Sequence, residues 1–183
     1  MNEREIAILP LRGVLVFPQM MIHLDVGRER SIVAIEQAML KDRRILLLAQ
    51  KEMEIDTPTA DDLYTVGTVA DIKQILRLPG GTLRVLVEGL HRGKVLEFLA
   101  EEPYFKARIQ QITADERITP ELENMARSLI HQFEEYARLS KKVSPETIGT
   151  VFADKEPGRM ADLISSHLSL KVEDKQAILD AID

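Results

Sequence analysis

The 183-residue sequence contains no cysteine and no tryptophan. The absence of cysteine excludes disulfides, thiolate metal sites and a cysteine nucleophile, and it fits a reducing compartment. Aromatic residues make up only 4% of the chain. We therefore do not expect an aromatic platform on which nucleic-acid bases could stack.

An excess of basic residues and a long apolar run are also lacking. With 24 Lys and Arg against 30 Asp and Glu, the formal net charge is -6, which argues against a general nucleic-acid binder. No apolar run approaches the roughly 20 residues that cross a bilayer. The first residues, MNEREIAILPLRG, contain no signal-peptide core. We expect a cytoplasmic protein with neither a membrane nor a nucleic-acid partner.

The clearest structural pattern lies in Val66–Arg92, around which the neighbouring segments are organised. Apolar Leu83, Val85 and Val87 occupy every second position, which places them on one face of a strand. The preceding residues 66–78 are also rich in β-branched and aliphatic side chains, and Pro79-Gly80-Gly81 is typical of a turn. The pattern predicts a β-hairpin, which needs further strands or a helix against its apolar face.

Short apolar segments on both sides of the hairpin can supply those strands. We expect strands or apolar runs at Glu5–Leu9, Val14–Phe17, Met20–Leu24, Arg44–Ala49, Val95–Phe98 and Tyr104–Ile112. Gly89 and Gly93 predict a bend or bulge. Helical spacing of apolar residues predicts one amphipathic helix from about residue 28 to about residue 41, and the polar residues 51–63 predict an exposed loop.

Helical patterns replace the alternation beyond residues 113–117. Thr119-Pro120-Glu121 and Ser144-Pro145-Glu146 each combine a capping residue, a proline at the first helical position and an acid. Two further helical segments begin at Pro157 and Lys171. The last pattern reaches Asp183 without a C-cap, so we expect the chain to be a piece of a longer protein.

Sequence motifs of catalysis and of cofactor or metal binding are absent. The chain contains no GxxxxGK[ST], no HExxH and no GxSxG. Its four histidines show no metal-ligand spacing, and Ser166 and His167 are neighbours that cannot face each other on a helix. We predict no catalytic residue, no cofactor-binding residue and no metal ligand in this chain.

Two apolar segments are candidates for a binding surface. One follows Phe17 and is rich in methionine, which adapts to irregular partners. The other lies near the hairpin tip, where exposed apolar residues reduce solubility unless they bind something. The candidate residues are Pro18, Met20, Met21, Ile22, Leu76 and Leu78. The alternative is that these residues are ordinary core, with the tip folded back onto residues 18–22.

Several ordered motifs resemble the N-terminal domain of the bacterial ATP-dependent Lon proteases. The strand-rich half contains LPLRGVLVFP at 9–18, VGR at 26–28, VGT at 66–68 and RVLVEGLHR at 84–92. The helical half contains EPGRMAD at 156–162 and DKQAIL at 174–179. The likeness covers almost the whole chain, and His23 stands where the family often has proline.

The resemblance implies an α+β fold. Residues 1–115 would form a β-rich pseudo-barrel of the PUA-like kind with one helix, and residues 116–183 would begin an α-helical bundle that leads to an ATPase. The parent enzyme would be a homo-oligomeric, usually hexameric, AAA+ serine protease. Its ATP and Mg sites and its Ser–Lys dyad would lie beyond Asp183. It would degrade misfolded, damaged and short-lived regulatory proteins in protein quality control and the stress response.

We therefore predict a substrate-recognition region that is not itself an enzyme. A weak apolar surface can select unfolded substrates, because native proteins bury the segments that it binds. One alternative is a structural oligomerisation module that self-associates through the apolar stripe of residues 122–137. Another is a stand-alone protein with only a Lon-type substrate-binding domain. The acidic charge disfavours a third, an RNA-binding domain suggested by the PUA-like fold.

Overall fold

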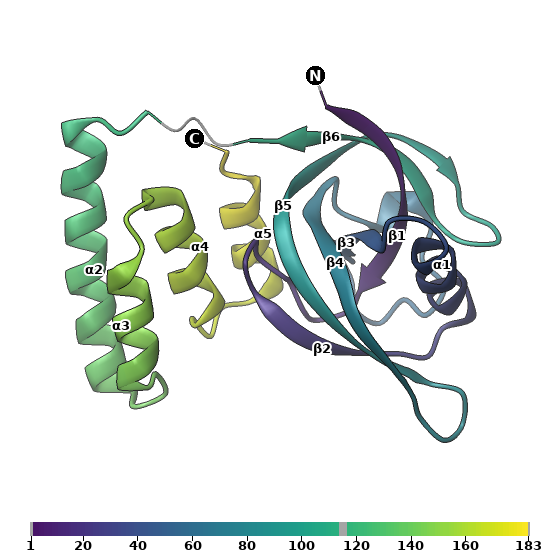
Figure 1. Cartoon of the computed structure of the whole chain (residues 1–183), viewed down its shortest axis with the longest axis horizontal. Coiled ribbons are helices and arrows are strands. Elements are labelled where there is room, and N and C mark those ends of the chain that lie inside the picture. The colour runs from purple at the N-terminus through teal and green to yellow at the C-terminus, as the bar shows by residue number, and fades with distance from the viewer. Residues whose placement is uncertain (1, 114–116, 183) are drawn as a thin grey trace. The chain divides into compact units, whose positions relative to one another are not determined.

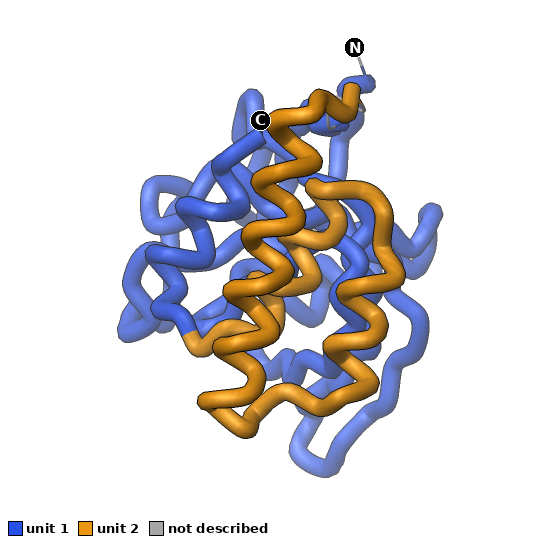
Figure 2. Tube along the Cα trace, turned by 90° about the vertical axis from the view of Figure 1, so that its left-hand side faces the viewer, with its two compact units in different colours: residues 1–113, 170–182 blue, residues 114–169, 183 orange. Residues whose placement is uncertain are grey.

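The computed structural model describes residues 2–113 and 117–182, which divide into two compact units. Unit 1, blue in Figure 2, contains the chain up to Thr113 together with Leu170–Ile182. Unit 2, orange in the same view, continues to Ser169. Each unit has a hydrophobic core of its own.

Unit 1 is built on one six-stranded sheet (Figure 1). The strands are β1 (Glu3–Leu11), β2 (Met21–Val26), β3 (Arg44–Ala49), β4 (Val66–Arg77), β5 (Leu83–Ala100) and β6 (Lys106–Ile112). Their order is β2-β5-β4-β3-β1-β6, and β6 also pairs with β5. The β1–β3 ladder is parallel, whereas β5 pairs with each of its neighbours in antiparallel fashion.

The sheet curls because two strands change partners along their length. β5 pairs with β4 through residues 83–94 and with β6 through residues 92–100. β1 pairs with β6 through residues 3–7 and with β3 through residues 8–11. Among the described strands β2 pairs with β5 alone and remains an edge strand. The α+β class, with a curled, strand-rich first unit, is confirmed.

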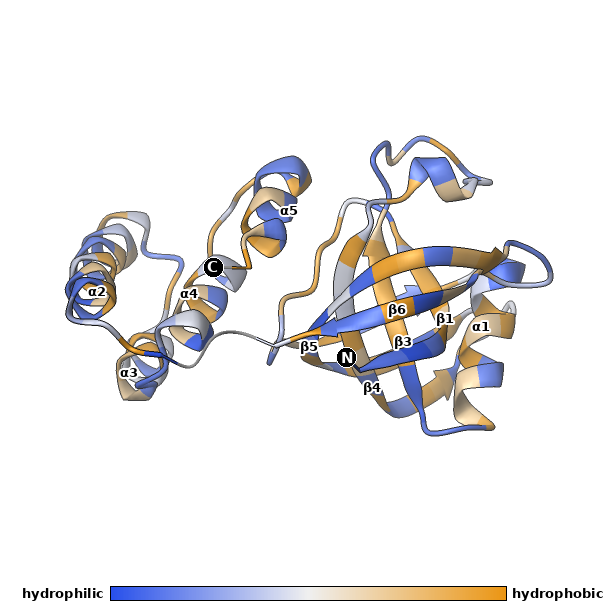
Figure 3. Ribbon diagram, turned by 90° about the horizontal axis from the view of Figure 1, so that it is seen from above, coloured by the Kyte–Doolittle hydropathy of each residue, from blue (hydrophilic) through white to orange (hydrophobic). Residues whose placement is uncertain are grey.

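Alternating burial along the strands forms the core of unit 1. Leu83, Val85 and Val87 of β5 are buried, whereas Arg84 between them is exposed. The strands in Figure 3 show orange and blue bands for the same reason. Helix α1 (Glu29–Met39) adds buried residues, among them Ile35, to this core.

The predicted hairpin is confirmed, and its second strand is longer than expected. β4 and β5 pair around a turn in which Gly80 and Gly81 have positive φ. No separate strand forms at residues 95–98, because β5 continues from Leu83 to Ala100. The expected bulge is present as a register shift between residues 69 and 70 of β4, whose partners are His91 and Gly89.

Helix α5 (Val172–Asp180) belongs to unit 1 and packs against β4. Arg92 Nε donates to the Leu179 carbonyl at 2.8 Å, and Gln176 Nε2 donates to the Val66 carbonyl at 2.9 Å. The expected domain boundary between residues 115 and 116 lies outside the described residues. The predicted helical domain included residues 170–182, and the structure differs by placing them with the strands.

Unit 2 contains three helices, α2 (Pro120–Ser140), α3 (Pro145–Ala153) and α4 (Pro157–Ser166). Thr119 and Ser144 cap α2 and α3 through their hydroxyl oxygens, as the sequence predicts. The core of the unit consists of Phe133, Val151, Met160 and Ile164. None of the described helices combines the length and the apolar character that crossing a bilayer requires.

Candidate functional site: a groove beside an edge strand

A groove with a volume of about 810 Å³ lies within unit 1, between segments of β1 and β2. Residues 9–12 at the end of β1 form one wall, and residues 22–27 along β2 form the other. Arg28 and Ser31 near the start of α1 and Arg84 of β5 complete the lining. This volume is within the usual range of ligand-binding clefts.

Pro10 explains why β1 does not pair across the groove. The proline nitrogen carries no hydrogen, so it cannot donate to a neighbouring strand. The Pro10 carbonyl oxygen already accepts a hydrogen bond from Arg28 Nη2 at 2.9 Å. Neither backbone group of Pro10 can therefore bond to a strand on the groove side, although Pro10 lies opposite Leu48 in the β1–β3 ladder.

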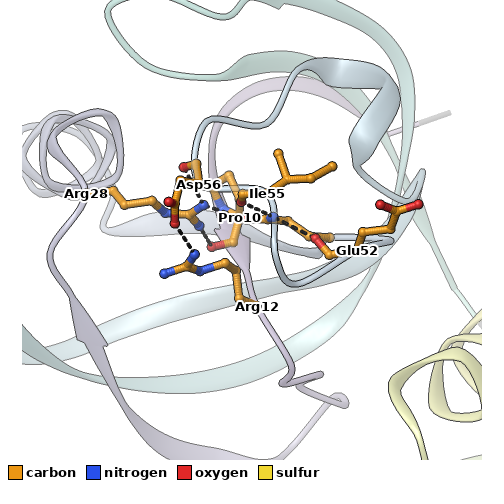
Figure 4. A network of polar contacts seen from close by, with 7 residues as sticks. Pro10, Arg12, Arg28, Glu52, Ile55 and Asp56 are labelled. Carbon is orange, nitrogen blue, oxygen red and sulfur yellow. Dashed lines mark hydrogen bonds and ion pairs between the residues drawn. The ribbon is translucent and has the colours of Figure 1, made fainter.

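Arg28 is the centre of a polar network at one end of the groove (Figure 4). Its Nη1 donates to Gln50 Oε1 at 2.5 Å and to the Asp56 carbonyl at 3.5 Å. The Nε2 of the buried Gln50 donates in turn to the carbonyls of Glu52 at 3.2 Å and Ile55 at 3.0 Å. Hydrogen bonds of this network thus connect the loop after β3 with the start of α1.

Two of the arginines that line the groove have carboxylate partners, whereas the acceptors of Arg28 are neutral. Burial, together with the nearby charges of Arg12 and Arg30, lowers the pKa of Arg28, whose guanidinium still remains a cation. Arg12 pairs with Asp56 at 2.7 Å, and Arg84 pairs with Asp25 at 2.8 Å. The hydrogen bond from Arg84 lowers the pKa of Asp25. Arg28 therefore keeps a positive charge at one end of the groove.

Replacing Arg28 is expected to destabilise unit 1 at this end of the groove. Arg28→Met should lower the free energy of unfolding of unit 1 by about 2 kcal/mol, because buried acceptors lose a charged donor. Urea unfolding followed by the amide signals of unit 1 would measure the change. Arg12→Met is the control, since its exposed pair with Asp56 is worth about 0.5 kcal/mol. Equal losses in the two variants would contradict the central position of Arg28.

Three of the predicted surface residues are largely covered. Pro18 is buried, and Met20 and Ile22 pack in part against the core beside α1. Residues 17–20 form a β-turn in which Met20 N donates to the Phe17 carbonyl at 3.2 Å and Gln19 has a φ of 68°. The expectation that Pro18 presents a free apolar surface is corrected, since Pro18 is buried in this turn, whereas Met20 and Ile22 stay partly accessible.

The other three predicted residues are at least partly accessible. Met21 is 56% exposed and Leu76 is 55% exposed, and Leu78 is half-buried. Met21 lies opposite Glu88 and Leu76 lies opposite Arg84, on the two sides of β5. Strand geometry separates them by about 10 Å across the sheet and about 13 Å along it. They share the outer face of the sheet without forming one contiguous patch.

The sequence alone does not reveal the groove. Its only local signal is Pro10 inside an apolar run that continues to Leu11, because proline within a strand indicates an edge. The roles of Arg28 and Gln50 depend on contacts with residues 18 or more positions away, which no local pattern encodes. No group of three His, Asp or Glu side chains in residues 2–113 and 117–182 could hold a metal ion.

Comparison with protein families gives one match over nearly the whole chain. The model of the ATP-dependent protease La (LON) substrate-binding domain matches residues 5–183. A Lon protease of Desulforamulus reducens is 53% identical over 180 residues, and one of Bacillus thuringiensis is 54% identical over 181 residues. These matches cover 98% and 99% of this chain but only 22% and 23% of the two relatives.

Solved structures show the same fold at low sequence identity. The N-terminal domain of Mycobacterium avium complex Lon protease aligns with a TM-score of 0.75 at 18% identity, covering 98% of this chain and 91% of that structure. A Lon N-terminal domain protein from Xanthomonas campestris aligns with a TM-score of 0.67 at 14% identity, with coverages of 98% and 92%.

Proposed function

Since this chain belongs to the LON substrate-binding domain family, we propose that it recognises unfolded protein substrates for an ATP-dependent protease. The groove between β1 and β2 carries the proposal. Its walls include Leu9, Leu11, Leu24 and Val26, and Arg12 and Arg84 in its lining have carboxylate partners. A groove that combines apolar and polar groups suits a polypeptide segment, which carries both kinds of group.

Binding by one such domain is expected to be weak. Burying about 400 Å² of apolar surface contributes on the order of 10 kcal/mol before costs. Ordering a flexible substrate and removing its translational freedom cancel most of that gain. Several copies on one oligomer would strengthen binding without new contacts, which fits a homo-oligomeric parent protease.

The remaining parts of the proposal concern the parent protein. We infer a cytoplasmic, hexameric AAA+ serine protease that uses ATP and Mg and acts in protein quality control and the stress response. The support is the similarity to Lon proteases of which this chain spans about 22%. The Ser–Lys dyad and the nucleotide site would lie outside this chain, to which we assign no catalytic step.

Exposed apolar residues on the outer face of the sheet are expected to add to the affinity. Met21→Ser with Leu76→Ser should weaken binding of reduced, carboxymethylated α-lactalbumin by about fivefold, because two apolar contacts are lost. Leu40→Ser is the matched control, since Leu40 is 79% exposed and lies in the same unit. Fluorescence anisotropy would measure the dissociation constants. An equal loss in the control would contradict a specific surface.

An NMR titration of the 183-residue chain tests the proposal as a whole. Native α-lactalbumin should leave the amide signals unchanged, and the reduced, carboxymethylated form should shift signals around the groove. Loss of this difference would overturn the proposal. A mass above monomer without any shifts would favour the oligomerisation alternative through residues 122–137, of which Met125 is 68% exposed.

A further inference from the structure

We propose that the groove receives an extended segment of the unfolded substrate, which adds a strand to the free edge of β2. This inference rests on the proposed function and specifies how the substrate is held. Its main partner would be the backbone of the substrate rather than particular side chains. Strand addition of this kind uses hydrogen bonds that every polypeptide can form.

The hydrogen bonds between β2 and β5 show which backbone groups remain free. Gly89 N donates to the Met20 carbonyl at 2.9 Å, and the register continues without a shift from Met21 opposite Glu88 to Val26 opposite Leu83. In an antiparallel ladder only every second pair exchanges hydrogen bonds. Counting from Met20, residues 22, 24 and 26 therefore bond to β5.

The hydrogen bonds between β5 and β4 lead independently to the same assignment of inward and outward backbone groups. Leu78 N donates to the Thr82 carbonyl at 2.8 Å in the hairpin, so Thr82 and every second residue after it direct their backbone groups toward β4. Val85 and Val87 then face β2. The N–H and C=O groups of residues 21, 23 and 25 of β2 consequently point away from β5.

The outward groups of His23 and Asp25 lie at the groove, which residues 22–27 line on this side. The groove is lined by Leu24 and Val26, whose side chains face the core, and also by His23 and Asp25, whose side chains face outward. A hollow that touches both kinds of side chain runs along the edge of the strand rather than over one of its faces. The six residues of β2 offer an edge about 20 Å long.

The groove is bounded on two sides. Residues 9–12 of β1 lie on its far side, so an added strand would lie between β1 and β2. Pro10 of β1 cannot form backbone hydrogen bonds with the added strand, because it has no N–H and its carbonyl oxygen already accepts a hydrogen bond from Arg28. Pairing is therefore directed to β2.

The lining suits substrates of many sequences. Apolar residues on both walls can cover alternate side chains of an extended chain. The pairs between Arg12 and Asp56 and between Arg84 and Asp25 neutralise two of the charges of the rim, whereas Arg28 keeps its charge. Recognition through the backbone thus distinguishes an unfolded chain from a folded one, whose backbone groups are already paired.

A proline in β2 separates this mode from binding by side chains. Asp25→Pro removes an outward N–H that does not bond to β5, so the fold should persist. We expect it to weaken binding of reduced, carboxymethylated α-lactalbumin to the 183-residue chain by fivefold or more. Asp25→Ala removes the same side chain and its pair with Arg84, keeps the N–H, and should bind within twofold of the unchanged protein.

Hydrogen exchange provides a second readout that needs no variant. With the reduced, carboxymethylated probe bound, the amides of Met21, His23 and Asp25 should exchange at least tenfold more slowly. The amides of Ile22 and Leu24 should be protected with and without the probe, because they bond to β5. This alternation along one strand is specific to strand addition.

The outcomes distinguish this inference from the proposed function. If Asp25→Pro binds the probe as well as Asp25→Ala does, and the alternation in exchange is missing, strand addition is wrong while substrate binding stands. If the unchanged protein does not bind the probe at all, both proposals fail. If Asp25→Pro unfolds, the exchange pattern of the unchanged protein decides alone.

Discussion

Gly89→Ala is expected to lower the free energy of unfolding of unit 1 by about 3 kcal/mol, at the upper end for overpacking. A methyl group at this position would overlap the carbonyl oxygen of Phe17 and lie 3.1 Å from Thr68 Cγ2. The overlapping atom is backbone, and Gly89 also exchanges hydrogen bonds with Gln19 and Met20. The turn at residues 17–20 therefore cannot move away without losing those bonds.

The glycine in helix α3 provides the control. No atom lies within 4 Å of the position that a Cβ would take at Gly149. Gly149→Ala should therefore stabilise unit 2 by about 0.5 to 1 kcal/mol through its helix propensity. Urea unfolding monitored by the separate amide signals of the two units would measure both effects. A Gly89→Ala variant as stable as the unchanged protein would contradict the close approach of the turn.

Leu179→Ala is expected to destabilise unit 1, although its position follows unit 2 in the sequence. Leu179 is 1% exposed and belongs to a core cluster with Leu15, Phe17 and Val66. Removing a buried leucine side chain leaves a cavity and typically costs 2 to 5 kcal/mol, so we expect a loss of about 3 kcal/mol. The unfolding midpoint of the unit 1 amide signals should fall, and that of unit 2 should not.

Ile182→Ala is the matched control for this prediction. Ile182 lies three positions further along the same segment and is 47% exposed, so its truncation should change stability by less than about 0.5 kcal/mol. If Leu179→Ala lowered the midpoint of unit 2 instead, α5 would belong with the helices. That result would support the boundary expected from composition alone.

Local patterns predict the elements of this fold well, because period and capping are local properties. The alternation at Leu83, Val85 and Val87 correctly indicates a half-buried strand, and the caps at Thr119 and Ser144 begin helices as expected. β3 occupies the predicted residues 44–49 without change. These features depend on neighbours within a few positions, which a single sequence shows directly.

The parts that could not be predicted depend on long-range contacts. The apolar pattern of residues 171–182 predicts a helix but not its partner, which is β4 rather than the preceding helices. Met21 and Ile22 look alike in the sequence, and only the register with β5 exposes one and covers the other. The groove likewise requires Pro10 and Arg28 to meet across 18 positions.

The return of α5 to the strands has a consequence for the order of folding during synthesis. The ribosome completes the sequence of the three helices of unit 2 at Ser169, before it makes the last segment of unit 1. Until Leu179 has left the exit tunnel, Phe17 and Val66 lack one of their buried neighbours. Unit 2 can therefore fold first, and the strand-rich unit that begins the chain is the last to be finished.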